Sequence, residues 1–265
     1  MKSSLLSILK FSAILFLAAA LPSCLQNETT ILLNKNGSGT IIEETFLTPA
    51  MLQMSAQFAQ PGSPDPLENL YSEEKAKAKA AKCGDLVEFV KIEKIEKAGM
   101  KGSRTHYKFS DINKLSITPQ SALENLGSGL PIPADKGKEP LKFEFSEGKL
   151  TIEPPVVDFS NLGPASALEG QDPQMAQMMQ DLIADMQIAV RFKATDGIAK
   201  TDATYLDADT ITLFDVQAGK MLAQKAQLTA IAETAKTDRA AAITEFKKLD
   251  GVKIETAEKI TVELK

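Results

Sequence analysis

The first 24 residues, MKSSLLSILKFSAILFLAAALPSC, constrain this chain most, because they have the features of a segment that never enters the folded body. Lys2 and Lys10 precede an apolar run that ends at Leu21, and no acidic residue occurs before Glu28. The run has the length of a signal-peptide core and is shorter than the ~20 apolar residues of a transmembrane helix. We therefore predict a signal peptide over residues 1–23.

The leader ends in Leu21-Pro22-Ser23-Cys24, which resembles a bacterial lipobox. The resemblance implies that the Cys24 thiol receives a diacylglyceryl group, that the chain is cut before it, and that the new amino terminus receives palmitate or a similar acyl chain. Two or more acyl chains anchor a protein stably, whereas one does so only marginally. We expect a lipid-anchored protein of the bacterial cell envelope, facing the periplasm or the exterior, with residues 24–28 as a short lipidated tether. The alternative is an ordinary secretory leader with a chance cysteine.

The composition argues against a nucleic-acid partner and against a framework of disulfides. Without the leader the chain has 28 basic residues, two fewer than the whole sequence, against 35 acidic ones. Nucleic-acid-binding proteins usually carry a basic footprint, so we expect no nucleic-acid partner. Only Cys24 and Cys83 occur, and lipid on Cys24 would leave Cys83 without an intramolecular disulfide partner. We expect Cys83 to be a small buried thiol.

Hydrophobic periodicity and turn residues predict an α+β domain over residues 29–265, with mixed, largely antiparallel sheets packed against helices. The clearest hairpin lies within 141–153, where a Glu147-Gly148 turn would place Phe145 opposite Leu150 and Phe143 opposite Ile152. The other predicted strands are 29–33, 40–46, 86–96, 104–109, 188–194, 198–204, 210–214, 252–254 and 259–264. The predicted helices are 49–59, 72–83, 173–187, 218–235 and 238–249.

The order hairpin, helix, strand, strand occurs twice, over 29–109 and over 141–204. It suggests a duplicated ββαββ unit, with two sub-units that meet near residues 110–140.

The sequence contains none of the usual motifs for catalysis, metal ions or nucleotides. His106 is the single histidine, so zinc sites with two histidines are excluded. Its alternation with Tyr107 and Phe109 places it on an outer strand face, with Arg104 and Lys108. No GxSxG, GxxxxGK[ST] or GxGxxG pattern occurs. We therefore expect no enzyme activity, no metal and no cofactor.

Two amphipathic helices each allow two interpretations. The helix from Pro173 repeats large apolar residues at helical spacing, which favours core packing over an adaptable surface for an apolar ligand or partner. That candidate surface comprises Met175, Met178, Met179, Leu182 and Met186. The helix 72–83 carries Lys75, Lys77, Lys79 and Lys82. A solvated face is favoured for these lysines over contact with anionic headgroups.

Three further segments carry a family resemblance: the Asn36-Gly37-Ser38-Gly39 turn after the lipobox, IAVRFKATDGIAKTDATYLDADTITLFDV over 188–216, and GVKIETAEKITVEL over 251–264. Together they resemble envelope lipoproteins of planctomycete and verrucomicrobial type and, more loosely, the LppM-type lipoproteins of actinobacteria. The resemblance implies a membrane-tethered α+β domain, with lipid binding proposed for some members, and supplies no catalytic residue.

The function expected from the sequence is a non-catalytic structural or interaction role at the membrane surface. The membrane is the expected partner through lipid on Cys24, and a protein or a lipid of the envelope is a further one. The alternative function is the binding or carrying of a lipid or other amphiphile in a cavity between sheet and helices.

Overall fold

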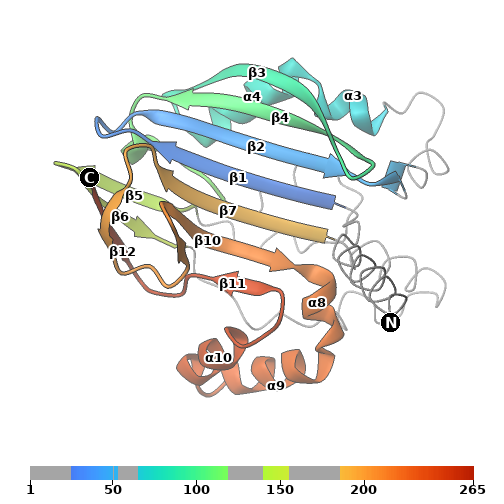
Figure 1. The fold of residues 1–265 in the computed structure, drawn as a ribbon. Helices are drawn as coiled ribbons and strands as arrows, with labels where there is room; N and C mark the ends of the chain where they lie inside the picture. Colours follow the sequence, from blue (N-terminus) through green and yellow to red (C-terminus); the bar gives the residue numbers. More distant parts are fainter. Residues whose placement is uncertain (1–24, 50, 53–64, 119–139, 155–185) are drawn as a thin grey trace, which may run out of the picture.

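The computed structural model describes residues 25–49, 51–52, 65–118, 140–154 and 186–265. These residues form an α+β fold built on a large mixed sheet with strand order β11-β10-β7-β1-β2-β4-β3, and β9 pairs with β10 (Figure 1). Its strands are β1 (Leu25–Leu33), β2 (Gly39–Leu47), β3 (Val87–Lys97), β4 (Met100–Phe109), β7 (Met186–Ala194), β9 (Leu206–Asp207), β10 (Thr210–Gln217) and β11 (Val252–Ile254). The β1–β7 pair is parallel, and the other pairs of this sheet are antiparallel.

A smaller antiparallel sheet, with order β5-β6-β12-β8, shares the main hydrophobic core with the large sheet. It consists of β5 (Lys142–Ser146), β6 (Lys149–Glu153), β8 (Ile198–Thr201) and β12 (Ile260–Leu264). The helices are α3 (Pro66–Leu70), α4 (Glu73–Cys83), the 3-10 helix η1 (Ile112–Lys114), α8 (Ala218–Ala223), α9 (Lys225–Ala235) and α10 (Arg239–Phe246). Helix α4 contributes Ala76, Ala80 and Cys83 to that core, whereas α9 and α10 form a separate apolar cluster against β10 and β11.

Strand β1 shows why the large sheet has one buried face. Its side chains alternate without exception between buried and partly exposed along all 9 residues. Ile31 and Leu33 have 0% exposure, while Thr30 and Leu32 on the other face are partly exposed. A period of two residues is the signature of a strand with one face packed.

The predicted register of the 141–153 hairpin is confirmed. Phe145 pairs with Leu150 and Phe143 pairs with Ile152 across the Glu147-Gly148 turn. Both turn residues have positive φ, 52° and 77°, as a two-residue type I′ turn requires. The same geometry recurs at Ala98-Gly99, so β4 begins at Met100 rather than at the predicted residue 104.

Helix α4 follows the sequence prediction closely. The Ser72 side chain accepts a hydrogen bond from the backbone N–H of Lys75, and Gly84 ends the helix with φ 140°. The predicted helix 218–235 is wrong as a single element, because it is divided into α8 and α9 at Gln224, whose φ of −100° and ψ of 39° are not helical.

Two expectations about organisation are corrected. Leu25 to Glu28 are not a tether, because they form the first part of β1 and pair with both β2 and β7. The two halves of the chain are not equivalent units either. Strands β1 to β4 are neighbours in one sheet, whereas β5 and β6 lie in the small sheet and β7 lies in the large one. The β1–β7 pair joins the halves within a single sheet.

Candidate functional site

One end of the large sheet is the part of the described fold nearest to Cys24 in the chain. Strand β1 begins at Leu25, the residue after Cys24, and Leu25 pairs with Leu47 of β2 and with Met186 of β7. The turn between β3 and β4 lies at the same end of the sheet (Figure 1). We call this the β1-start end.

A small apolar cluster lies at the β1-start end. Leu25, Leu47 and Leu70 are buried, with exposures of 3%, 2% and 7%. Five partly buried side chains pack on them: Met51, Leu52, Leu67, Tyr71 and Met186. Met186 belongs to β7 and not to the end of a helix, as the sequence suggested. The other predicted site residues, Cys24, Met175, Met178, Met179 and Leu182, lie outside the described residues.

The β3–β4 hairpin places three exposed lysines at the β1-start end: Lys94, Lys97 and Lys101. The Lys94 Nζ lies 4.7 Å from the centre of the Tyr71 ring, and the Lys97 Nζ lies 5.8 Å from the centre of the Phe46 ring. Burial, followed by the negative charges of Glu96 and Asp65, raises the pKa of the Tyr71 hydroxyl. Tyr71 therefore remains neutral at physiological pH.

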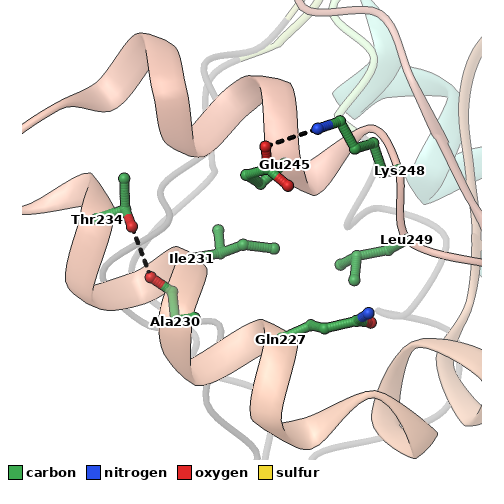
Figure 2. Close-up of a pocket in the computed structure, with 7 residues that line it drawn as sticks. All are labelled: Gln227, Ala230, Ile231, Thr234, Glu245, Lys248 and Leu249. Carbon is green, nitrogen blue, oxygen red and sulfur yellow. Dashed lines mark hydrogen bonds and ion pairs between the residues drawn. The ribbon is translucent and has the colours of Figure 1, made fainter.

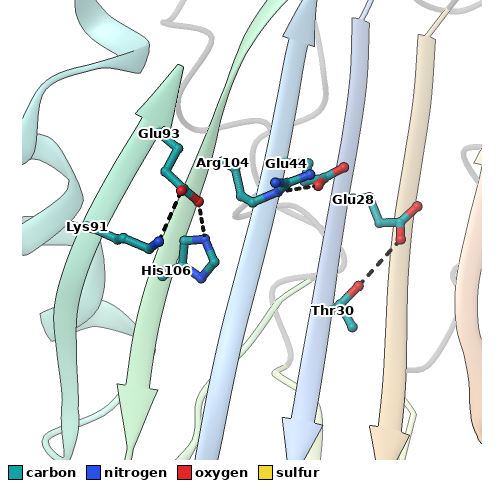
Figure 3. Close-up of polar contacts among 7 residues, drawn as sticks. All are labelled: Glu28, Thr30, Glu44, Lys91, Glu93, Arg104 and His106. Atoms are coloured by element: carbon teal, nitrogen blue, oxygen red, sulfur yellow. Dashed lines mark hydrogen bonds and ion pairs between the residues drawn. The ribbon is translucent and has the colours of Figure 1, made fainter. Parts of the chain in front are cut away.

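A row of charged and polar side chains crosses the outer face of the sheet (Figure 3). His106 Nε2 lies 2.8 Å from Glu93 Oε2, and the Lys91 Nζ donates to Glu93 Oε1 at 3.0 Å. Arg104, on the same strand as His106, pairs with Glu44 of β2, its Nε donating to Oε1 at 2.6 Å. The outer position of His106 was predicted from alternation, but its partner Glu93, on a different strand, was not.

The same row continues on β7 and β10. Arg191 contacts both Glu28 and Asp215 at 3.1 Å. Hydrogen bonds from Lys91 and then His106 hold the pKa of the Glu93 carboxyl below its ordinary value. A general acid needs a raised pKa near the working pH, and Glu93 has the opposite shift.

The buried face of the sheet contains an ion pair that the sequence did not suggest. Lys79 Nζ lies 2.5 Å from Glu43 Oε1, and these side chains are only 11% and 4% exposed. Asn27 Nδ2 donates to Glu43 Oε1 at 3.2 Å and to Thr45 Oγ1 at 2.8 Å. The prediction of a solvated Lys79 is therefore wrong. The Lys77 side chain of the same helix is 63% exposed and pairs with Glu73, as a solvated face requires.

A pocket of about 200 Å³ lies between α9 and α10 (Figure 2). Ile231 and Leu249 line it, and the Glu245–Lys248 ion pair, with 2.7 Å between Oε1 and Nζ, lies at its border. Sites for drug-sized ligands usually enclose ~300–1,000 Å³. Its apolar lining continues into the cluster that holds α9 and α10 on the sheet.

Among the described residues, no group of three or more His, Cys, Asp or Glu side chains lies close enough to hold a metal ion. In the same part of the chain, none of the helices combines the length and the apolar character needed to cross a bilayer.

Comparison with known proteins gave one structural likeness. No family model matches the chain, and no curated protein matches it. The solution structure of the folded domain of Mycobacterium tuberculosis LppM aligns with a TM-score of 0.33 and 11% identity, over 76% of this chain and 88% of that domain.

Proposed function

We propose that this chain is an exported, lipid-anchored protein of the bacterial cell envelope that acts at the membrane surface in a structural or interaction role, without catalysis. The observation that carries this proposal is the start of β1. Leu25 is 3% exposed and lies in a fully paired strand, so no residue would lie between the folded body and a lipidated Cys24. With no flexible linker, the lipid would hold the β1-start end of the sheet against the bilayer.

The electrostatics of the described residues support a role without catalysis. The acidic side chains with shifted pKa values are Glu93, Glu153 and Asp209, and all three shift downward. The leading cause is a hydrogen bond in each case, from Lys91 to Glu93, from Lys259 to Glu153 and from the backbone N–H of Ile198 to Asp209. Carboxylates held ionised in this way stabilise a surface and do not supply protons at neutral pH.

The test is the intact mass and the membrane fractionation of the full-length chain expressed in a bacterial host, as wild type, Cys24→Ala and Cys83→Ala. We expect the wild type to begin at Cys24, to carry diacylglyceryl and acyl groups, and to fractionate with membranes. Cys24→Ala should lack this mass. Cys83→Ala should retain it, because Cys83 is a buried side chain of the core, with 6% exposure. Cleavage of the wild type at another position, with a soluble product, would contradict the proposal.

Carriage of an amphiphile between sheet and helices has less support. A cavity between sheet and helices would need accessible apolar side chains, and in the 141–153 hairpin Phe143, Leu150 and Ile152 are instead packed into the core at 5%, 0% and 0% exposure. The α9–α10 pocket is smaller than most ligand sites, and a larger hollow of about 400 Å³ between α4 and β3 has the charged side chains of Lys77, Asp85 and Glu88 in its lining, whereas ligand sites are mostly apolar. Organic extraction of the purified protein followed by mass spectrometry tests this function. A stoichiometric lipid in addition to the covalently attached one would support it.

A further inference from the structure

Two lysines of the β3–β4 hairpin, Lys97 and Lys101, lie level with the start of β1, and Lys94 lies level with Asn27. Across the sheet, Leu25 is in register with Leu47, Leu47 with Lys101, and Lys101 with Glu96. Neighbouring strands are spaced by ~4.8 Å, so the Lys101 backbone is about 10 Å from that of Leu25. Lys97 pairs with Met100 one position further toward the turn. Any surface that reaches Leu25 from this end also comes within reach of Lys97 and Lys101.

The hairpin carries an excess of positive charge, with the carboxylates of Glu96 and Asp65 near Tyr71 at the same end. Residues 91–104 include five basic and two acidic side chains. Lys91 and Arg104 form ion pairs with Glu93 and Glu44. Within the described ranges, Lys94, Lys97 and Lys101 form no ion pair with a carboxylate, and all three are exposed. Lys94 and Lys97 contact aromatic rings, which leaves their charge in place.

The opposite end of the sheet has a different balance of charge. This end carries Asp111 and Asp196 in its turns and Asp207 in β9, together with the exposed lysines Lys35 and Lys114. A negatively charged plane would therefore be attracted to the β3–β4 hairpin more than to the other end. A bilayer with anionic lipid is such a plane, and its potential extends over a Debye length of ~8 Å at physiological salt.

We propose that Lys94, Lys97 and Lys101 of the β3–β4 hairpin dock on the anionic phospholipid headgroups of the membrane that holds the Cys24 lipid. This proposal rests on the proposed function, because the anchor is what brings the β1-start end to the bilayer. The hairpin would then orient the body and prevent it from pivoting about a single lipidated residue. Each lysine near an anionic surface strengthens binding about fivefold.

The experiment uses the mature chain, residues 24–265, produced without lipid and with Cys24→Ala. Its binding is measured by co-sedimentation with vesicles of phosphatidylcholine alone, or with one third phosphatidylglycerol. We expect binding at least tenfold tighter with phosphatidylglycerol, and loss of this preference at ~1 M salt, where the Debye length is ~3 Å. The variant Lys97→Glu with Lys101→Glu should abolish the preference.

The matched control is Lys35→Glu with Lys114→Glu, which changes net charge by the same amount at the opposite end of the sheet. It should bind within twofold of the unmodified chain, and urea midpoints should show that both variants are folded. The proposal is overturned if the control weakens binding as much as the hairpin variant does. It is also overturned if the chain binds equally well with and without phosphatidylglycerol. An acidic protein would then be the better partner for the three lysines. Because the test needs no acyl chain, its failure is distinct from failure of the anchor.

Discussion

At the residue scale, the pair Glu43–Lys79 shows how strongly burial changes the role of a charge. Lys75, Lys77 and Lys79 alternate along one helix, yet only Lys79 extends into the interior to reach a strand residue 36 positions earlier. Removing two charges from water costs several kcal/mol per ion, and a close partner with further hydrogen bonds offsets that cost. Asn27 supplies one such bond to Glu43. The pair therefore links α4 to β2 in the interior of the protein.

Lys79→Met should lower the free energy of unfolding by about 3 kcal/mol, because it leaves the Glu43 carboxylate buried opposite an apolar side chain. Replacing both residues, with Glu43→Met added, should recover most of that loss. The exposed pair provides the control, and Lys77→Met should change stability by less than ~0.5 kcal/mol. Urea unfolding at neutral pH measures all three variants. Equal losses for Lys79→Met and Lys77→Met would show that burial of Lys79 has no energetic consequence.

At the scale of elements, two tight hairpins have strained first turn residues. Ala98 and Glu147 have φ of 50° and 52°, in the left-handed region, and each precedes a glycine with positive φ. Side chains other than Asn, Asp and Gly are disfavoured there. The strands form nevertheless, because their apolar faces are buried: Leu150 has 0% exposure at the start of β6.

Glu147→Asn should stabilise the protein by about 0.5 kcal/mol, since Asn-Gly is the preferred type I′ turn. Gly148→Ala should do the opposite and cost about 1 kcal/mol. A Cβ at Gly148 would meet no atom within 4 Å, so its cost comes from the backbone alone. Thermal unfolding followed by circular dichroism gives both values. If Glu147→Asn destabilises the protein, then interactions of the glutamate side chain stabilise the fold by more than its backbone strain costs.

At the scale of the whole molecule, acidic and basic groups set a window of pH stability. The pKa values of Glu93, Glu153 and Asp209 lie below the ordinary 4.5, 4.5 and 3.8, so these groups bind protons more weakly in the folded state. Their stabilisation is complete above those ordinary values and is lost as pH falls through the lower native ones. Burial raises the pKa of Tyr107, and the hydrogen bond that Lys259 donates to Glu153 raises the pKa of Lys259.

The raised groups act at the other end of the pH scale. Tyr107 and Lys259 contribute fully below their ordinary values of 10.0 and 10.5, and their contribution is lost as pH rises through the native ones. We expect urea midpoints to be constant between about pH 5 and pH 9 and to fall on both sides. The double variant Glu93→Gln, Asp209→Asn should reduce the slope on the acid side and leave the alkaline side unchanged, because neither residue causes the raised pKa of Tyr107 or of Lys259. If the slope on the acid side is unchanged, other carboxyl groups cause the loss of stability at low pH.

The sequence by itself determined the features that depend on neighbours along the chain. Alternation identified the inward faces of the strands, including Tyr107 and Phe109, which are 2% and 3% exposed. The turn residues Glu147-Gly148 set the hairpin register, and Ser72 and Gly84 marked the ends of α4. The leader and its cysteine likewise predict export and attachment from consecutive residues, and this remains a prediction. Local patterns succeed here because hydrogen-bond geometry and side-chain period act over a few residues.

Only the tertiary structure decided which distant segments meet. The parallel pairing of β1 with β7 brings Leu25 beside Met186, and parallel strands need a long connection without a local turn signal. The same holds for His106 with Glu93, for Lys79 with Glu43, and for the lysines of the β3–β4 hairpin beside the first residue of β1. These contacts form because two sheets and their helices pack around one core. That packing is set by the burial of apolar surface from the whole chain, so no short stretch of sequence predicts it.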